Sequence, residues 1–84
     1  MKFEAWFKFP DMTIGVHESK GIFRCHHFHG ELLSRKNSND CHSILELKYY
    51  LLSIPNAPKK EIMLLIRRLD TQKLQKKLVK HKIE

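Results

Sequence analysis

The sequence has few of the residues that dominate disordered, disulfide-rich or membrane-embedded chains. Its 84 residues include three glycines, three prolines and two cysteines, so a low-complexity chain is excluded and the cysteines could form at most one disulfide bond. The longest uninterrupted apolar run, residues 62–66, is much shorter than the roughly 20 residues of a membrane-spanning helix. Glu4 and Lys8 interrupt the N-terminal stretch, so we expect no signal peptide. We therefore expect no membrane partner and a cytoplasmic location.

The composition is that of one small globular domain. Apolar residues make up 42% of the chain and charged residues 30%, which is a normal balance for a folded protein. A chain of this length buries only about 60% of the surface that its unfolded form exposes. It is therefore too short for two cores, and we expect residues 1–84 to form a single domain.

The N-terminal third has the period-two alternation of antiparallel strands. Apolar and polar residues alternate over residues 3–9 and again over 12–17, and a third strand-like stretch covers 22–28. Turn-forming residues separate these stretches, and short turns join antiparallel neighbours. The pattern predicts a three-stranded antiparallel β-meander within residues 1–29, followed by a polar loop over 30–40.

The same alternation assigns the aromatic residues to the two faces of the sheet. Phenylalanines in this pattern are more typical of a core than of a ligand-stacking surface. Trp6 has the opposite parity from Phe3, so it should point outward and could contact a partner. The residues expected in the core are Phe3, Phe7, Phe9, Phe23 and Phe28.

Beyond residue 40 the apolar spacing becomes helical. A stripe of leucines and isoleucines predicts a first, mostly buried helix over residues 41–54. A Pro-Asn-Ala-Pro segment ends it and opens a second helix over 57–82. The apolar stripe of this second helix shifts near 70–71, so the helix either breaks there or packs its last turns on something other than the core. The expected fold class is α+β, with both helices on one face of the sheet.

The expected helix starts rest on capping residues. Asp40 could cap the first helix, or Ser43 could do so in a capping box with Glu46. Asn56 is the expected N-cap of the second helix.

Positive charge is concentrated in the last third of the chain. The formal net charge is +7, and residues 59–84 hold nine Lys and Arg against three acidic residues, whereas residues 1–58 hold seven against six. Such a segment can meet phosphates or an acidic protein surface, although a solvated helix face is the simpler alternative. The candidate partner-binding residues are Trp6, Arg67, Arg68, Lys73, Lys76, Lys77 and Lys80.

Cysteine and histidine cluster in the middle of the chain. Cys25, His27 and His29 should project from the same side of a strand. Two more potential ligands, Cys41 and His42, follow at the expected start of the first helix. The helix dipole stabilises a thiolate at this position. Four such ligands can hold zinc tetrahedrally. We therefore expect one structural zinc ion per chain, with its ligands drawn from Cys25, His27, His29, Cys41 and His42.

The Cys/His cluster is also compatible with two roles that need no structural zinc. The cysteines could be small core residues and the histidines a polar strand face. His27, Asn39 and His42 before a helix are also faintly similar to the His-Asn-His nucleases, which would make the chain a small metal-dependent nuclease. We find no glycine-rich phosphate loop, and we expect no small-molecule substrate.

The small size, the positive charge and the Cys/His cluster together resemble the zinc-containing type II anti-CRISPR proteins of phages and mobile elements. This resemblance implies a non-enzymatic inhibitor in the host cytoplasm that binds the Cas9 effector and prevents target DNA from loading. The basic residues would then dock on an acidic surface of the effector. The alternative from another class is a basic DNA- or RNA-binding module, whose affinity would fall steeply with salt.

Overall fold

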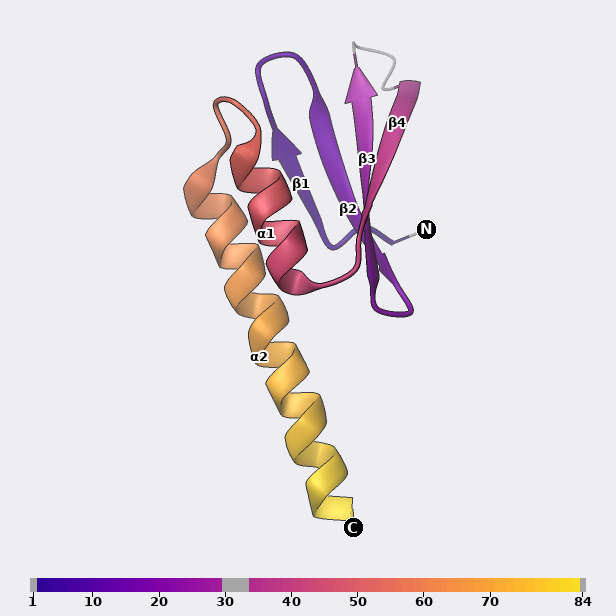
Figure 1. Cartoon of the computed structure of the whole chain (residues 1–84), viewed down its shortest axis with the longest axis vertical. Helices are drawn as coiled ribbons and strands as arrows, with labels where there is room; N and C mark the ends of the chain where they lie inside the picture. Colours follow the sequence, from indigo (N-terminus) through magenta and orange to yellow (C-terminus); the bar gives the residue numbers. More distant parts are fainter. Residues whose placement is uncertain (1, 30–33, 84) are drawn as a thin grey trace.

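The computed structural model of the chain describes residues 2–29 and 34–83, with the side chains of 34–37 and 77–83 outside this description. The described chain forms an antiparallel sheet of four strands followed by two helices (Figure 1). This arrangement confirms the predicted α+β fold. The elements are β1 Ala5–Lys8, β2 Thr13–Ser19, β3 Ile22–His29, β4 Ser34–Cys41, α1 Ile44–Ser53 and α2 Lys59–Ile83.

The strands follow the order β1-β2-β3-β4, so each one pairs with its neighbour in sequence. Trp6 on β1 lies opposite Gly15 on β2, Gly15 opposite His26 on β3, and His26 opposite Ser38 on β4. These four residues form one row across the sheet. Both helices lie on the same side of the sheet, α1 contacting β4 and α2 contacting β1 (Figure 1). No described element covers the opposite face.

The fourth strand corrects the predicted loop over residues 30–40. Residues 30–33 lie outside the described part, but Ser34–Cys41 is a strand that pairs with β3. The sequence of β4 lacks apolar alternation because it is an edge strand, which gains stability from hydrogen bonds to β3 on one side only. Its only fully buried apolar side chain is that of Cys41, at its last position, among residues whose burial is described.

The core lies between the sheet and the helices. Every second residue of β2 and β3 faces it, and α1 and α2 contribute their apolar stripes. Three of the five phenylalanines predicted to be in the core are buried there, whereas Phe3 and Phe28 lie on the opposite face of the sheet. The buried core residues are Phe7, Phe9, Ile14, Val16, Phe23, Cys25, Cys41, Leu47, Leu51, Ile62, Leu65, Ile66 and Leu69.

Helix α1 begins with one of the two predicted caps. The Ser43 hydroxyl accepts a hydrogen bond from the Glu46 backbone N–H at 3.0 Å, and the Glu46 carboxylate accepts one from the His42 N–H at 3.2 Å. Together these bonds satisfy two donors at the start of the helix. Asp40 belongs to β4 instead and does not act as a cap.

Helix α2 is continuous from Lys59 to Ile83, so of the two alternatives considered for residues 70–71 the break does not occur. No glycine or proline occurs in this segment, and the helix has no local reason to end. Every residue from 70 to 76 is exposed, and the second half of the helix runs past the sheet and α1 (Figure 1). The longest extent of the molecule is therefore 50 Å against 25 and 17 Å in the other directions.

Asn56, which was predicted to cap the second helix, lies in the connection between the helices. Asn56 has a φ of 61°, a left-handed conformation that asparagine adopts more readily than most residues. It therefore belongs to the turn after α1, and α2 begins three residues later, at Lys59. Neither helix of the described chain is both long and apolar enough to cross a membrane.

Candidate functional site

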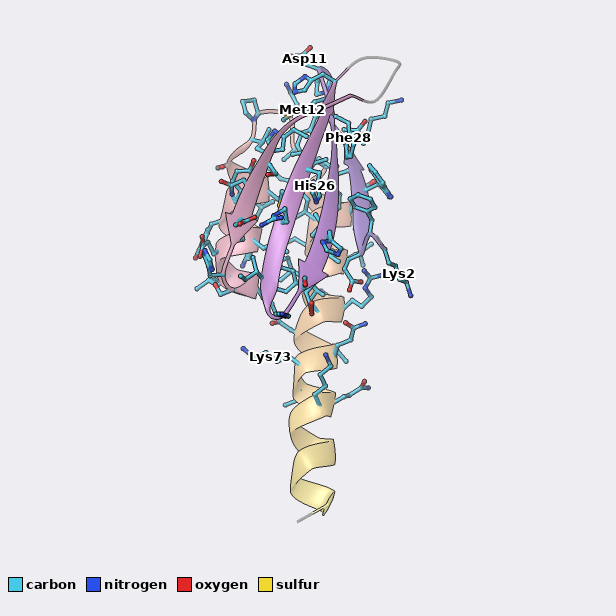
Figure 2. All side chains as sticks on the ribbon, turned by 90° about the vertical axis from the view of Figure 1, so that its right-hand side faces the viewer. Lys2, Asp11, Met12, His26, Phe28 and Lys73 are labelled. Atoms are coloured by element: carbon cyan, nitrogen blue, oxygen red, sulfur yellow. The ribbon has the colours of Figure 1, made fainter. Side chains whose placement is uncertain are left out.

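The uncovered face of the sheet carries a cluster of five rings, here called the aromatic face. Its members come from the N-terminal segment and from three adjacent strands, β1, β2 and β3. Figure 2 looks onto this face, where His26 and Phe28 are labelled near the middle of the sheet. The aromatic face consists of Phe3, Trp6, His17, His26 and Phe28.

Phe3 makes ring contacts with all four other members of the aromatic face. Its ring centroid lies 4.4 Å from that of Trp6 and 5.6 Å from that of His26, with the latter pair in an edge-to-face arrangement. Trp6 also contacts Phe28, at 5.4 Å between centroids. Distances and tilts of this kind are favourable for aromatic pairs. The contacts hold the Trp6 ring in place although it is half exposed.

Gly15 leaves room for the rings of Phe3 and Trp6. A Cβ atom at this position would lie 2.8 Å from Phe3 Cδ1 and 2.8 Å from Trp6 Cζ3, which is too close for any side chain. Both rings therefore rest directly against the backbone of β2. A bulge in the pairing of β3 with β4 follows between His27 and Phe28, next to the cluster.

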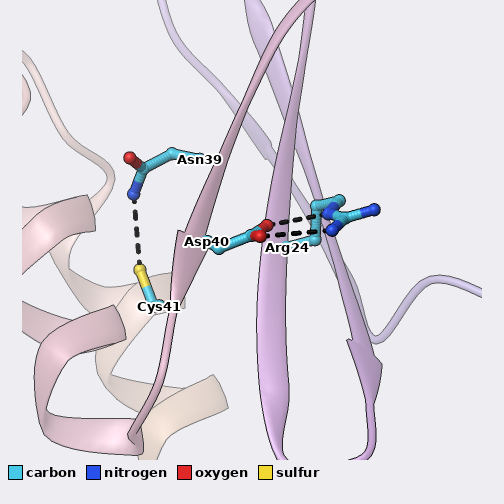
Figure 3. A network of polar contacts seen from close by, with 4 residues as sticks. All are labelled: Arg24, Asn39, Asp40 and Cys41. Atoms are coloured by element: carbon cyan, nitrogen blue, oxygen red, sulfur yellow. Dashed lines mark hydrogen bonds and ion pairs between the residues drawn. The ribbon is translucent and has the colours of Figure 1, made fainter.

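One ion pair flanks the aromatic face (Figure 3). Arg24 on β3 donates to both carboxylate oxygens of Asp40 on β4, from Nε at 2.7 Å and from Nη2 at 3.1 Å. The hydrogen bond from Arg24 lowers the pKa of Asp40. Asp40 therefore stays ionised and paired across the normal pH range.

The two predicted cysteine ligands lie together on the helix side of the sheet. Cys25 on β3 and Cys41 on β4 are both fully buried and unoxidised, and their thiols interact. The side-chain amide of Asn39 donates to Cys41 Sγ at 3.6 Å (Figure 3). Burial raises the pKa of both thiols, so both are protonated at neutral pH.

The predicted histidine ligands do not join this pair. The ring of His27 hydrogen-bonds to the Tyr50 hydroxyl on α1. His29 is at the end of β3 and only partly buried. His42 is exposed between β4 and α1, and its backbone bonds to Glu46.

The geometry therefore gathers two of the five expected zinc ligands. Among the described residues, no group of three or more His, Cys, Asp or Glu side chains is placed to hold a metal ion. Two protonated thiols would have to lose their protons and recruit further ligands before they could bind zinc tetrahedrally. The bound zinc stays a prediction, which elemental analysis of the purified protein decides.

The partial burial of the His27 ring makes stability depend on pH. Burial lowers the pKa of His27, and the charge of His29 lowers it further. Between that lowered value and the ordinary value of about 6.5, the unfolded chain binds a proton that the folded chain does not. We therefore expect the free energy of unfolding to decrease as the pH falls through this window.

Urea unfolding of the parent and of His27→Gln across this pH window measures the effect. The variant removes the titrating ring, so its stability should fall less with acid than that of the parent. His42→Gln, which removes an exposed histidine, is the control and should follow the parent. An unchanged pH dependence in His27→Gln would contradict the assignment.

The predicted basic residues divide into two groups along α2. Arg68 is tied to the body of the protein, because its guanidinium donates to the Glu4 carbonyl at 2.7 Å and lies 3.7 Å from the Glu4 carboxylate. Arg67 is exposed beside Met63 and Leu64 in a shallow groove. Lys77 and Lys80 lie in the part of α2 whose side chains are not described.

Lys73 and Lys76 form the second group, on the part of α2 that extends past the sheet. Both are exposed and line one side of a cleft of about 320 Å³. Glu18 and His42 lie on the other side of this cleft. The cleft is thus mixed in charge, and the side chains of both lysines are open to solvent.

Alternation along β3 could have placed Phe28 on the uncovered face of the sheet. Phe28 was expected in the core because it is apolar. Phe28 has the same parity as His26 on β3, so alternation alone places both on one face. Phe3 carried no such signal, because its parity matched the core residue Phe7. The strand begins only at Ala5, and the preceding bend turns Phe3 to the other face.

The chain matches no protein-family model, and no curated protein or solved structure is significantly similar to it.

Proposed function

We propose that the chain is a non-enzymatic nucleic-acid-binding module that contacts phosphates through the projecting half of α2. The observation that carries the proposal is a change of residue type along one side of this helix. Ile62, Ile66 and Leu69 face the core. Continued at 3.6 residues per turn, the same side is occupied by Lys73 and Lys76.

This change divides α2 into a first half that packs on the core and a second half that is available for binding. The first half of α2 contributes buried side chains, whereas every residue from 70 to 76 is exposed. Lysines on a helix that extends away from the body can approach a phosphate backbone without disturbing the core. The net charge of +7 adds a long-range attraction for a polyanion.

The absence of catalysis in this proposal rests on the state of the candidate nucleophiles. Cys25 and Cys41 are fully buried, and burial raises the pKa of each thiol. A protonated thiol without access to solvent is a poor nucleophile. The three residues similar to the His-Asn-His nucleases have separate partners: His27 bonds to Tyr50, Asn39 to Cys41, and the backbone of His42 to Glu46.

The inhibitor role implied by the anti-CRISPR resemblance stays a prediction. It shares with the nucleic-acid-binding role a basic surface and the lack of catalysis, and differs in the partner, which would be an acidic protein. The dependence of affinity on salt and on the type of polyanion separates the two.

A salt titration tests the proposed function. The anisotropy of a fluorescein-labelled oligonucleotide reports binding as the salt concentration rises. If the basic residues make about four phosphate contacts, the affinity should fall roughly 100-fold between about 50 and about 200 mM salt. An affinity independent of salt, or no binding at the lowest salt, would contradict the proposal.

A further inference from the structure

We propose that the aromatic face is a stacking platform for the bases of a single-stranded nucleic acid, with Trp6 as the ring that meets the first base. This inference rests on the proposed function and names the form of nucleic acid. It assigns a role to the uncovered face of the sheet, which α2 does not reach.

The ring of Trp6 is both exposed and fixed. Half of its surface is open to solvent, while Phe3 supports it at 4.4 Å and Phe28 at 5.4 Å between centroids. Gly15 lets the ring rest on the sheet, since any Cβ there would collide with it. A base that stacks on a ring already held in place does not have to immobilise it, which lowers the entropic cost of binding.

The open sheet suits unpaired bases better than a duplex. Bases inside a double helix are stacked on one another and present only their edges, whereas bases of a single strand can lie flat on an aromatic ring. A row of rings across adjacent strands offers such flat contacts. Its members that solvent can reach are Trp6 on β1, His17 on β2 and Phe28 on β3, whereas His26 is buried beneath them.

The charges around the aromatic face favour a polyanion. The four strands contain two carboxylates, Glu18 and Asp40. Glu18 lies on the helix side, in the cleft with Lys73, and Asp40 is held by Arg24. Both strand carboxylates are therefore turned away or ion-paired.

Cations border the same face. Lys8 is exposed two residues after Trp6, on the same side of β1. The Arg24 side chain is about half exposed even though it pairs with Asp40. In Figure 2, Lys2 lies at the lower edge of the sheet, above the projecting half of α2. Positive groups thus occur on both sides of the rings, where a single strand would carry its phosphates.

Intrinsic fluorescence gives a direct test, because Trp6 is the single tryptophan of the chain. An oligodeoxythymidylate of about 12 nucleotides should quench this fluorescence as it binds, and oligouridylate should act in the same way. A duplex of the same length should bind through α2 without quenching.

Substitutions locate the stacking contact. Trp6→Ala should weaken binding of the labelled single strand roughly tenfold and leave duplex binding unchanged. Trp6→Phe keeps a ring and should retain most of the affinity, which separates stacking from a loss of folding. Tyr49→Ala is the matched control, because Tyr49 is a similarly exposed aromatic residue on α1, and it should bind as the parent does.

Three results would overturn the inference in distinguishable ways. Oligonucleotide binding without quenching would leave the proposed function intact and remove the aromatic face from it. Absence of binding to any oligonucleotide at low salt would overturn both proposals. A molar mass that doubles with concentration in sedimentation, and does so only when Trp6 is present, would assign the face to a second copy of the chain.

Discussion

The double variant Lys73→Glu/Lys76→Glu is expected to lose most of its affinity for nucleic acid. Both lysines are exposed on the projecting half of α2, and their reversal would replace the two proposed phosphate contacts with two repulsions. We expect the dissociation constant to rise by roughly 10- to 100-fold at about 100 mM salt, and the slope of log affinity against log salt to become shallower by about two. Fluorescence anisotropy across a salt series measures both quantities.

A matched double variant exists on the same helix. Lys59→Glu/Lys60→Glu makes the same change in net charge, but at the end of α2 that lies beside the core. We expect it to weaken binding much less than the first variant does. Equal losses in the two variants would show that total charge, and not the projecting half of α2, governs binding. Both variants should unfold within about 1 kcal/mol of the parent, since the altered side chains are exposed.

Leu51→Ala should cause the largest loss of stability. Leu51 is fully buried on α1 between the sheet and α2, and its truncation removes apolar contacts and leaves a cavity. Such substitutions cost about 2–5 kcal/mol. A domain of this size has a total stability of roughly 4–12 kcal/mol, so the melting temperature should fall by roughly 10–30 °C.

Leu45→Ala is the control for this loss. Leu45 is on the same helix and is 58% exposed, so the same chemical change should cost less than about 0.5 kcal/mol. Thermal unfolding followed by circular dichroism compares the two variants. Similar melting temperatures for Leu45→Ala and Leu51→Ala would mean that α1 does not pack as described.

The sequence predicted the strands and the helix that bury one face and expose the other. Strands β1 to β3 and helix α1 alternate between buried and exposed positions, and this period is visible in the residue types. Strand β4 was missed because pairing with β3, and not its own residues, makes it a strand. The continuity of α2 was left open, because a shift of the apolar stripe looks the same whether a helix ends or extends into solvent.

The candidate site was harder to predict than the fold, for a geometric reason. The outward direction of Trp6 followed from alternation, and the structure confirms it. The aromatic face, however, depends on the bend before Ala5 that turns Phe3 over, and on the space above Gly15. The expected metal cluster assumed that one strand and the start of the first helix, joined by a loop, would bring four of the five candidate side chains to one point. The described geometry directs His27 to Tyr50 instead.

The sequential order of the strands has a consequence for the rate of folding. Each hairpin of the sheet, like the helical pair, closes over a short segment, and closing a short loop costs little chain entropy. The docking of α2 on β1 is different, because Arg68 and Glu4 are 64 positions apart. We therefore expect the meander and the helical pair to form first, and the joining of the two ends of the chain to be the late, rate-limiting step.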